Sequence, residues 1–295
     1  MNQILLDSRD TRYVLFEMLA VDKLNLYEKY SGHDRQIYED TLHLAEKIAA
    51  QQFYPVNAEG DHVGISYDRT SGTVTTPESF KPAYQAMARA GFIGVSADPD
   101  FGGLGMPLAV SVACKEYFCS ACGSLTFYAL LTGSAAQLVH SFGTQQQKRL
   151  YLPQMLSGAW GGTMCLTEPN AGSEVGNVKT RAIPQENSAY LISGQKIFIS
   201  AAENTIWRTI SFTWFWRALM ETPPAPGGYP FLSSPNIFRH PTGHPLNAMT
   251  SFVQGSSTRW VSTAFQPAHC HSVKMAGAQV IFLAIGERVC GRCFR

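Results

Sequence analysis

The feature of the sequence that most constrains the fold is a change of pattern at Gly158. Before it, apolar residues recur at helical spacing. After it, the segments AWGGTMCLTE, KTRAIP and AYLISGQKIFIS are rich in the β-branched, aromatic and small residues typical of strands. The sequence therefore predicts an α+β chain, in which an N-terminal all-α helical bundle is followed by a β domain.

Four of the five expected helices are assigned from periodicity and end signals. The first covers residues 34–53, and the apolar residues near one face of it are Ile37, Leu44, Ala45 and Ile48. Two more fit residues 107–122 and 124–142, and a shorter one fits residues 144–158. The glycine-rich segment ADPDFGGLGMP is expected to be a loop between helices.

The remaining helix has the clearest end signals. Thr76 can cap it, Pro77 suits its first position, and Gly91 suits the position after its last turn. Pro82 interrupts the pattern, so a start at that residue is the alternative. Its apolar stripe consists of Phe80, Tyr84, Met87 and Ala88.

Charge and composition exclude several classes of function. The net charge of +1 over 295 residues argues against nucleic acid or an anionic membrane as a partner recruited by bulk electrostatics. No membrane span is expected, because no window approaches 18 apolar residues. The N-terminus does not read as a signal peptide, and seven cysteines in a chain this long do not suggest a disulfide scaffold, so a cytoplasmic location is expected.

The segment MCLTEPNAGSEVG, residues 164–176, supports two interpretations. It can be an ordinary strand that ends in a turn at Pro169. It can also be a ledge for a cofactor, with the Thr167 hydroxyl at the strand end and backbone N–H groups of the Gly-Ser bend turned toward an anion. Ser193–Gly194 is expected to be a hairpin turn, followed by a strand at residues 196–200 that places Phe198 and Ser200 on one face. An aromatic face beside hydroxyl groups would suit a flat heterocycle such as a flavin.

These residues carry a resemblance to the acyl-CoA dehydrogenases. The helical first half, MCLTEPNAGSEVG and the following GQKIFIS resemble that family's pattern, with Glu174 in place of the usual aspartate. The segments DSRDTRYVLFEML, SGTVTTPESFKPAY and ADPDFGGLGMP resemble the larger subclass that includes 3-methylmercaptopropionyl-CoA dehydrogenase. The resemblance covers roughly residues 5–203. It implies a β-barrel-like middle domain and a flavoprotein that uses FAD to oxidise an acyl-CoA to a trans-2-enoyl-CoA.

The resemblance also implies roles for individual residues. Thr167 would hydrogen-bond the flavin edge, Phe198 would pack on the ring, Ser200 would lie near its N5 atom, and Ser173 would contact both cofactor and acyl-CoA. The implied cofactor-binding residues are Met164, Cys165, Leu166, Thr167, Gly172, Ser173, Phe198, Ile199 and Ser200. No catalytic residue is assigned, because the family's glutamate base lies in a C-terminal helical domain well beyond Ser200. Glu168 is read as part of the structural motif and not as that base.

The sequence after about residue 203 does not continue the family pattern. It is crowded with Trp, Phe and Pro and has neither helical nor strand periodicity. When each codon is read from one nucleotide earlier, Ile206–Ala218, Gly228–Ile237 and Thr258–Ala264 can spell consecutive β-domain segments of the same subclass. We therefore expect a helical domain at 1–158, the start of a β domain at 159–203, and an out-of-frame tail at 204–295. As it stands, this chain is expected to be inactive, and a non-catalytic, degenerate family member is the alternative.

Two CxxC pairs are the remaining motif that could carry chemistry. Cys119 and Cys122 fall inside an expected helix, and Cys290 and Cys293 fall in the doubtful tail, with His269, Cys270 and His271 between the pairs. Because the pairs are so far apart, neither a zinc site nor a thiol-redox role is expected. The family resemblance adds two partners, an electron-transferring flavoprotein and further copies of the chain in a homo-oligomer.

Overall fold

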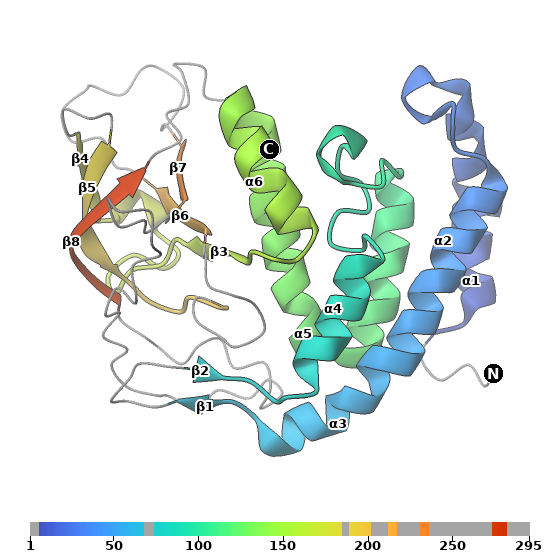
Figure 1. The fold of residues 1–295 in the computed structure, drawn as a ribbon, viewed down its shortest axis with the longest axis horizontal. Helices are drawn as coiled ribbons and strands as arrows, with labels where there is room; N and C mark the ends of the chain where they lie inside the picture. The colour runs from blue at the N-terminus through green and yellow to red at the C-terminus, as the bar shows by residue number, and fades with distance from the viewer. Residues whose placement is uncertain are drawn as a thin grey trace.

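The computed structural model describes residues 6–67, 74–184 and 189–201 and, beyond them, the strands at 212–216, 231–235 and 273–281. The helices lie together on one side of the molecule and most of the strands lie on the other (Figure 1). Their order along the chain confirms the α+β class, with the helical part first. A short antiparallel pair, β1 (Ser66–Tyr67) and β2 (Val74–Thr75), interrupts the helical part.

The N-terminal segment packs on the next helix by polar contacts. It consists of α1 (Ser8–Arg12), a π-helical turn (Tyr13–Met18) and two 3₁₀ turns (Val21–Leu26 and Glu28–Tyr30). Arg12 Nε donates to Glu39 Oε2 at 2.7 Å, and Ser8 Oγ donates to Glu46 Oε1 at 2.6 Å. The sequence interpretation had assigned no elements here, because such short turns have little periodicity.

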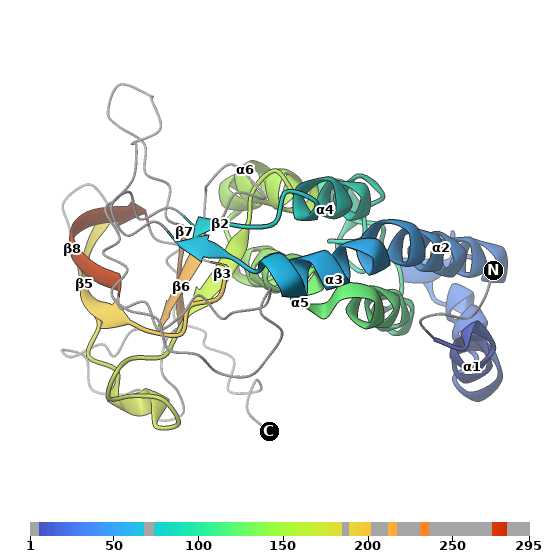
Figure 2. The same cartoon turned by 90° about the horizontal axis from the view of Figure 1, so that it is seen from below.

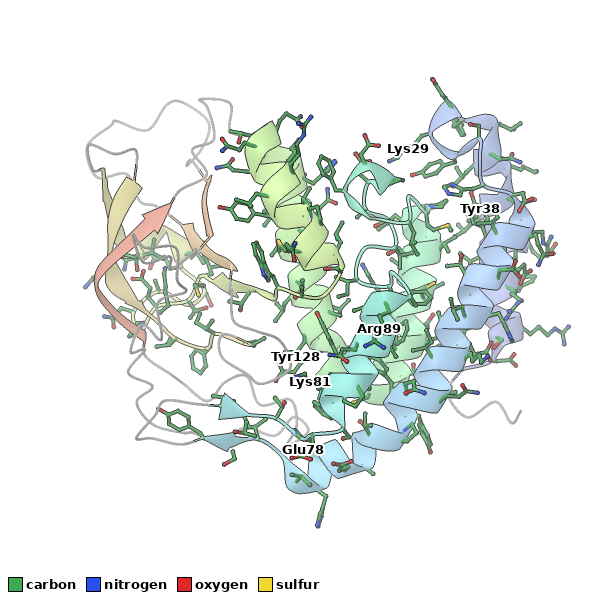
Figure 3. All side chains as sticks on the ribbon, in the orientation of Figure 1. Lys29, Tyr38, Glu78, Lys81, Arg89 and Tyr128 are labelled. Atoms are coloured by element: carbon green, nitrogen blue, oxygen red, sulfur yellow. The ribbon has the colours of Figure 1, made fainter. Side chains whose placement is uncertain are left out.

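Helix α2 (Arg35–Ile48) begins at Asp34, whose side chain accepts the Ile37 N–H. Its buried stripe is Tyr38, Leu42 and Ala45, all 0% exposed, and Tyr38 lies on the side of α2 that faces the other helices (Figure 3). The prediction that Leu44 shares this face was wrong, since Leu44 is 42% exposed. The chain continues through a π-helical turn (Ala49–Phe53) into α3 (Tyr54–Val63).

Helix α4 (Phe80–Arg89) confirms the predicted end but not the predicted start. Gly91 follows the last turn with φ 81°, a left-handed conformation that glycine adopts without steric cost. The helix begins at Phe80 and not at Thr76 or Pro82, and Thr76 is buried instead of capping. All four residues of the expected stripe are buried: Phe80, Tyr84, Met87 and Ala88.

Helix α5 (Leu108–Phe142) is broken where two helices were expected to meet. Cys122 has non-helical angles, φ −157° and ψ 88°, which separate residues 108–121 from 123–142. The Cys122 thiol and the Ser124 hydroxyl are hydrogen-bonded at 3.3 Å, and Thr126 Oγ1 donates to the Cys122 carbonyl at 2.8 Å. Helix α6 (Gln145–Leu156) follows, and a capping box between Thr144 and Gln147 closes its start.

The strands beyond Gly158 form two open, three-stranded sheets. In one, β3 (Gly162–Cys165) pairs in parallel with β6 (Phe212–Trp216), which pairs with β7 (Phe231–Pro235). In the other, β5 (Ala189–Lys196) lies between β4 (Arg181–Pro184) and β8 (Val273–Ile281). The described strands do not close into a barrel.

The predicted hairpin turn at Ser193–Gly194 was wrong. Strand β5 continues through both residues, and its pairing with β8 shifts register between Ile192 and Gly194. Glycine in a strand marks a bulge as well as a turn, and here it marks the bulge.

The helical part and the first sheet meet where β3 passes α5, and Figure 2 shows β3 extending from the strands toward α5. The Gly162 N–H donates to Thr132 Oγ1 at 3.0 Å, and Thr132 Oγ1 donates to the Tyr128 carbonyl at 2.9 Å. A Cβ on Gly162 would lie 2.6 Å from the Ala135 Cβ. The close approach of β3 to α5 therefore requires glycine at residue 162.

Candidate functional site

The first half of the candidate site is the loop that leaves β3. Cys165 is buried, Leu166 and Thr167 are half-buried, and Glu168 forms a bridge with Ala171 by two backbone hydrogen bonds of 3.1 Å. This narrow turn leaves Gly172 and Ser173 exposed on the loop. Of the expected Met164 contact, the structure describes only the backbone, which lies in β3.

The second half is the segment that leaves β5, and the structure brings it against the first. The Ile197 N–H donates to the Thr167 carbonyl at 2.9 Å. Two residues before the end of β3, Thr163 Oγ1 donates to the Ser200 carbonyl. Thr167 and Ser200 therefore lie on two segments that hydrogen bonds join, although these segments are far apart in the sequence. Residues 167–171 and 197–201 together are called the ledge.

The expected strand at residues 196–200 is not formed. Strand β5 ends at Lys196, and Phe198 and Ala201 have positive φ values of 58° and 57°. A strand period of two therefore does not place Phe198 and Ser200 on one face. Phe198 is instead 50% exposed, while Ile199 is 2% exposed and fixes the segment to the interior.

A buried ion pair lies between the two halves. Lys196 is 1% exposed and Glu168 is 5% exposed, and Lys196 Nζ lies 2.8 Å from Glu168 Oε1. Lys196 Nζ also donates to the Leu166 carbonyl at 2.9 Å. Glu168 also contacts Thr180, whose N–H and hydroxyl donate to Glu168 Oε1 at 3.0 and 2.5 Å.

These contacts determine the protonation of Glu168. Burial by itself would raise the pKa of Glu168, but the hydrogen bonds from Lys196 and Thr180 and from the Lys179 N–H outweigh it and hold that pKa below its ordinary value. A general base must approach the proton that it removes and must have a suitable pKa. Glu168 is a buried carboxylate with four donors, which agrees with its interpretation as a structural residue.

The arrangement presents groups that suit a flat, polar-edged ligand. The partly exposed Thr167 carries a hydroxyl, the half-exposed Phe198 carries an aromatic face, and the turn at Gly172 has no atom within 4 Å of the position of a Cβ. The sequence interpretation identified these residues but missed Lys196 and Thr180. The available signal was Lys196, the one charged residue between Tyr190 and Ile199.

Two kinds of feature are absent from the part of the chain that the structure describes: a cluster of metal-ligating residues and a membrane-spanning helix. Its His, Cys, Asp and Glu residues form no cluster of three or more that could hold a metal ion. Cys290, Cys293 and the histidines near Cys270 lie outside that part. No described helix combines the length and the apolar character that a membrane crossing requires.

Comparison with family models identifies two consecutive domains. Residues 44–159 match the model of the acyl-CoA dehydrogenase N-terminal domain, and residues 163–218 match that of the acyl-CoA dehydrogenase middle domain. The boundary between the two matches falls at the change of pattern seen at Gly158.

Curated relatives agree with this match. The chain is 32% identical to 3-methylmercaptopropionyl-CoA dehydrogenase of Ruegeria pomeroyi over 76% of its own length and 37% of that protein. It is 36% identical to the broad-specificity linear acyl-CoA dehydrogenase FadE5 of Mycobacterium tuberculosis over 66% of its length and 32% of the relative. The chain thus spans only about a third of the length of these relatives.

Solved structures show the same fold at low sequence identity. Butyryl-CoA dehydrogenase of Megasphaera elsdenii superimposes with a TM-score of 0.61 at 21% identity, over 84% of this chain and 57% of that one. An acyl-CoA dehydrogenase of Bacillus anthracis, solved in complex with FAD, superimposes with a TM-score of 0.59 at 15% identity, over 82% of this chain and 36% of that one.

Proposed function

Because the chain belongs to the acyl-CoA dehydrogenase family, we propose that it forms the FAD-binding ledge of an enzyme that oxidises acyl-CoA thioesters to trans-2-enoyl-CoA. The observation that carries this proposal is the joining of the Thr167 and Ser200 segments by backbone and side-chain hydrogen bonds beside an exposed aromatic ring. A relative solved with FAD supports the choice of cofactor.

The residues of the ledge fit a flavin by their chemistry. Thr167 would hydrogen-bond the ring edge, Phe198 would pack against its face, and Ser200 would supply a hydroxyl near N5. Cys165, Leu166 and Ile199, with Met164, would form the apolar floor, and Gly172 and Ser173 would face the cofactor phosphates and the acyl-CoA. When bound, FAD supplies the acceptor for the hydride that leaves the substrate's β carbon.

We infer that the chain of 295 residues does not complete this reaction by itself. Removal of the α proton requires a positioned carboxylate, and Glu168 is engaged by Lys196 and Thr180. The base would belong to the longer enzyme, which would also transfer electrons to an electron-transferring flavoprotein, assemble as a homo-oligomer and reside in the cytoplasm.

The proposed reason for the incomplete domain is a change of reading frame between Ala202 and Thr205. Its consequence is a division into a helical domain at 1–158, the start of the middle domain at 159–203 and an out-of-frame tail at 204–295. The middle-domain match covers residues 163–218 and so crosses the proposed point. The division therefore rests on the loss of periodic pattern after about residue 203 and on the shifted-frame spelling of the later segments. Sequencing both strands of the gene across Ala201–Ile206 tests it, and a gene with no alternative frame for the family segments would contradict it.

The function is tested by producing the present chain and a frame-restored chain side by side. Bound FAD is measured by absorbance, and turnover is measured with a panel of acyl-CoA substrates and an artificial electron acceptor. We expect turnover from the restored chain alone. Comparable turnover by the present chain would show that a base exists among its own residues, and a restored chain without FAD would refute the assignment.

A further inference from the structure

The Glu168–Lys196 pair connects three separate segments of the candidate site. Lys196 Nζ joins the Glu168 carboxylate and the Leu166 carbonyl, at 2.8 and 2.9 Å. Glu168 also accepts the N–H groups of Lys179 and Thr180, at 2.6 and 3.0 Å. Both partners are almost completely buried. The pair therefore fixes the exit of β3, the approach to β4 and the end of β5 to one another.

Stability alone does not account for a buried ion pair at this position. Replacing such a pair by apolar residues of similar volume is often neutral or stabilising, because both charges lose their hydration. Conformational specificity is the better explanation, since the pair's neighbours along the chain are the residues of the ledge. Thr167 precedes Glu168, Ile197 follows Lys196, and a hydrogen bond of 2.9 Å joins Ile197 to Thr167.

Peptide geometry shows how the pair acts on Thr167. The Leu166 carbonyl and the Thr167 N–H belong to one planar trans peptide, so they point in opposite directions. Because Lys196 binds that carbonyl from the interior, the Thr167 N–H is directed away from Lys196. A lysine without its carboxylate partner would not be buried at this point as a charged group.

We propose that Glu168 and Lys196 are a positioning pair that sets the geometry of the ledge before any cofactor binds. Lys196 orients the peptide between Leu166 and Thr167, and Glu168 neutralises Lys196 and fixes residues 179–180. The benefit to cofactor affinity rests on the proposed function, whereas the ordering of the ledge is a property of the chain itself. The pair touches no reacting atom and is not catalytic.

The test uses the chain of 295 residues and three variants: Lys196→Met, Glu168→Gln and the double variant. Global stability is measured by urea unfolding, and ledge order is measured without cofactor by hydrogen exchange at residues 167–171 and 197–201. FAD affinity is measured by quenching of flavin fluorescence. Arg12→Met with Glu39→Gln is the matched control, because that pair, joined at 2.7 Å, ties the N-terminal segment to α2.

Both single variants should lose stability, because each leaves one buried charge without its partner. The double variant should regain most of it but lose ledge protection about tenfold, the loss expected for one hydrogen bond to a charged group, with a similar fall in FAD affinity. The control should change stability without changing ledge exchange. Wild-type exchange rates at the ledge of the double variant would overturn the proposal.

Two further outcomes separate this proposal from the proposed function. If the wild-type chain binds no FAD, the cofactor assignment fails for this chain and hydrogen exchange still decides the positioning role. If the double variant does not fold, Lys196→Arg decides, because arginine keeps a positive charge beside Glu168 but its planar guanidinium does not reproduce the single bond from Lys196 Nζ to the Leu166 carbonyl. Lys196→Arg should loosen the ledge while keeping most of the stability, and wild-type exchange at the ledge of this variant would refute positioning by Lys196.

Discussion

Replacing Gly162 by alanine tests the contact between the helical part and the sheet most directly. The added Cβ would lie 2.6 Å from the Ala135 Cβ, 3.2 Å from Met155 Cε and 3.3 Å from the Thr132 Cα. The Met155 side chain can move, but the other two atoms belong to α5 and cannot move independently of it. Since carbon atoms pack at about 3.5–4.0 Å, β3 and α5 would have to separate by roughly 1 Å.

The free-energy cost has two sources. Overpacking of a core site costs about 1–3 kcal/mol. A separation of this size would also break the bond of 3.0 Å from the Gly162 N–H to Thr132 Oγ1, and an unmet buried donor costs about 1–3 kcal/mol. Alanine also reduces the conformational entropy of the unfolded chain, which offsets about 0.4–1 kcal/mol of this cost. We therefore expect Gly162→Ala to lower the free energy of unfolding by about 2–4 kcal/mol.

The measurement is urea unfolding of the wild type and Gly162→Ala, followed by circular dichroism. Gly172→Ala is the matched control, because its Cβ would meet no atom within 4 Å. The control should differ from the wild type by less than about 1 kcal/mol. Equal stability of Gly162→Ala and the control would show that β3 does not pack closely on α5, and the reasoning from this contact would fail.

Three further predictions concern the site and the thiols. The lowered pKa of Glu168 means that its contribution to stability is present above the unfolded value of 4.5 and lost as the pH falls through the folded value. Below pH 4.5, the free energy of unfolding should therefore fall less steeply with pH in Glu168→Gln than in the wild type. Identical pH profiles of the two proteins would contradict this. Of the four cysteines in the described part, Cys119 should be alkylated first, as seen by mass spectrometry, because it alone of the four is exposed. Burial raises the pKa of Cys119 as well as that of Cys122, and it raises the pKa of Cys114 to about 12. Faster labelling of Cys122 would show that the break in α5 opens. In the frame-restored protein, Thr167→Val should weaken FAD binding by about 1–3 kcal/mol, measured by titration; unchanged affinity and unchanged flavin potential would remove Thr167 from the site.

Local signals in the sequence predicted the features that depend on local chemistry. Gly91 ends α4 because a left-handed residue is needed there, and the break at Cys122 falls where two helices were expected to meet. Thr76 carries the same kind of signal but lies buried away from the helix start, since tertiary packing prevailed over its capping preference.

Features that depend on distant residues were not predictable in this way. The bulge at Gly194 requires the pairing of β5 with β8, whose sequence gave no periodic signal. The burial of Lys196 depends on Glu168, 28 residues away. The ledge residues themselves were found from their motif, but their geometry was not, because positive φ at Phe198 replaced the expected strand.

The location of the main hydrophobic core has a consequence for synthesis on the ribosome. Its buried members run from Leu15 to Ala129. Of the partly buried residues packed on it in the described part of the chain, Leu6 precedes that span and Ala201 follows it. Domains generally fold as units during translation, the N-terminal one first. The helical core can therefore form while the sheet is still being translated. If the gene carries the proposed change of reading frame near Ala202–Thr205, its product would combine a helical core that can form with open strand edges, and such edges favour pairing with other chains and aggregation.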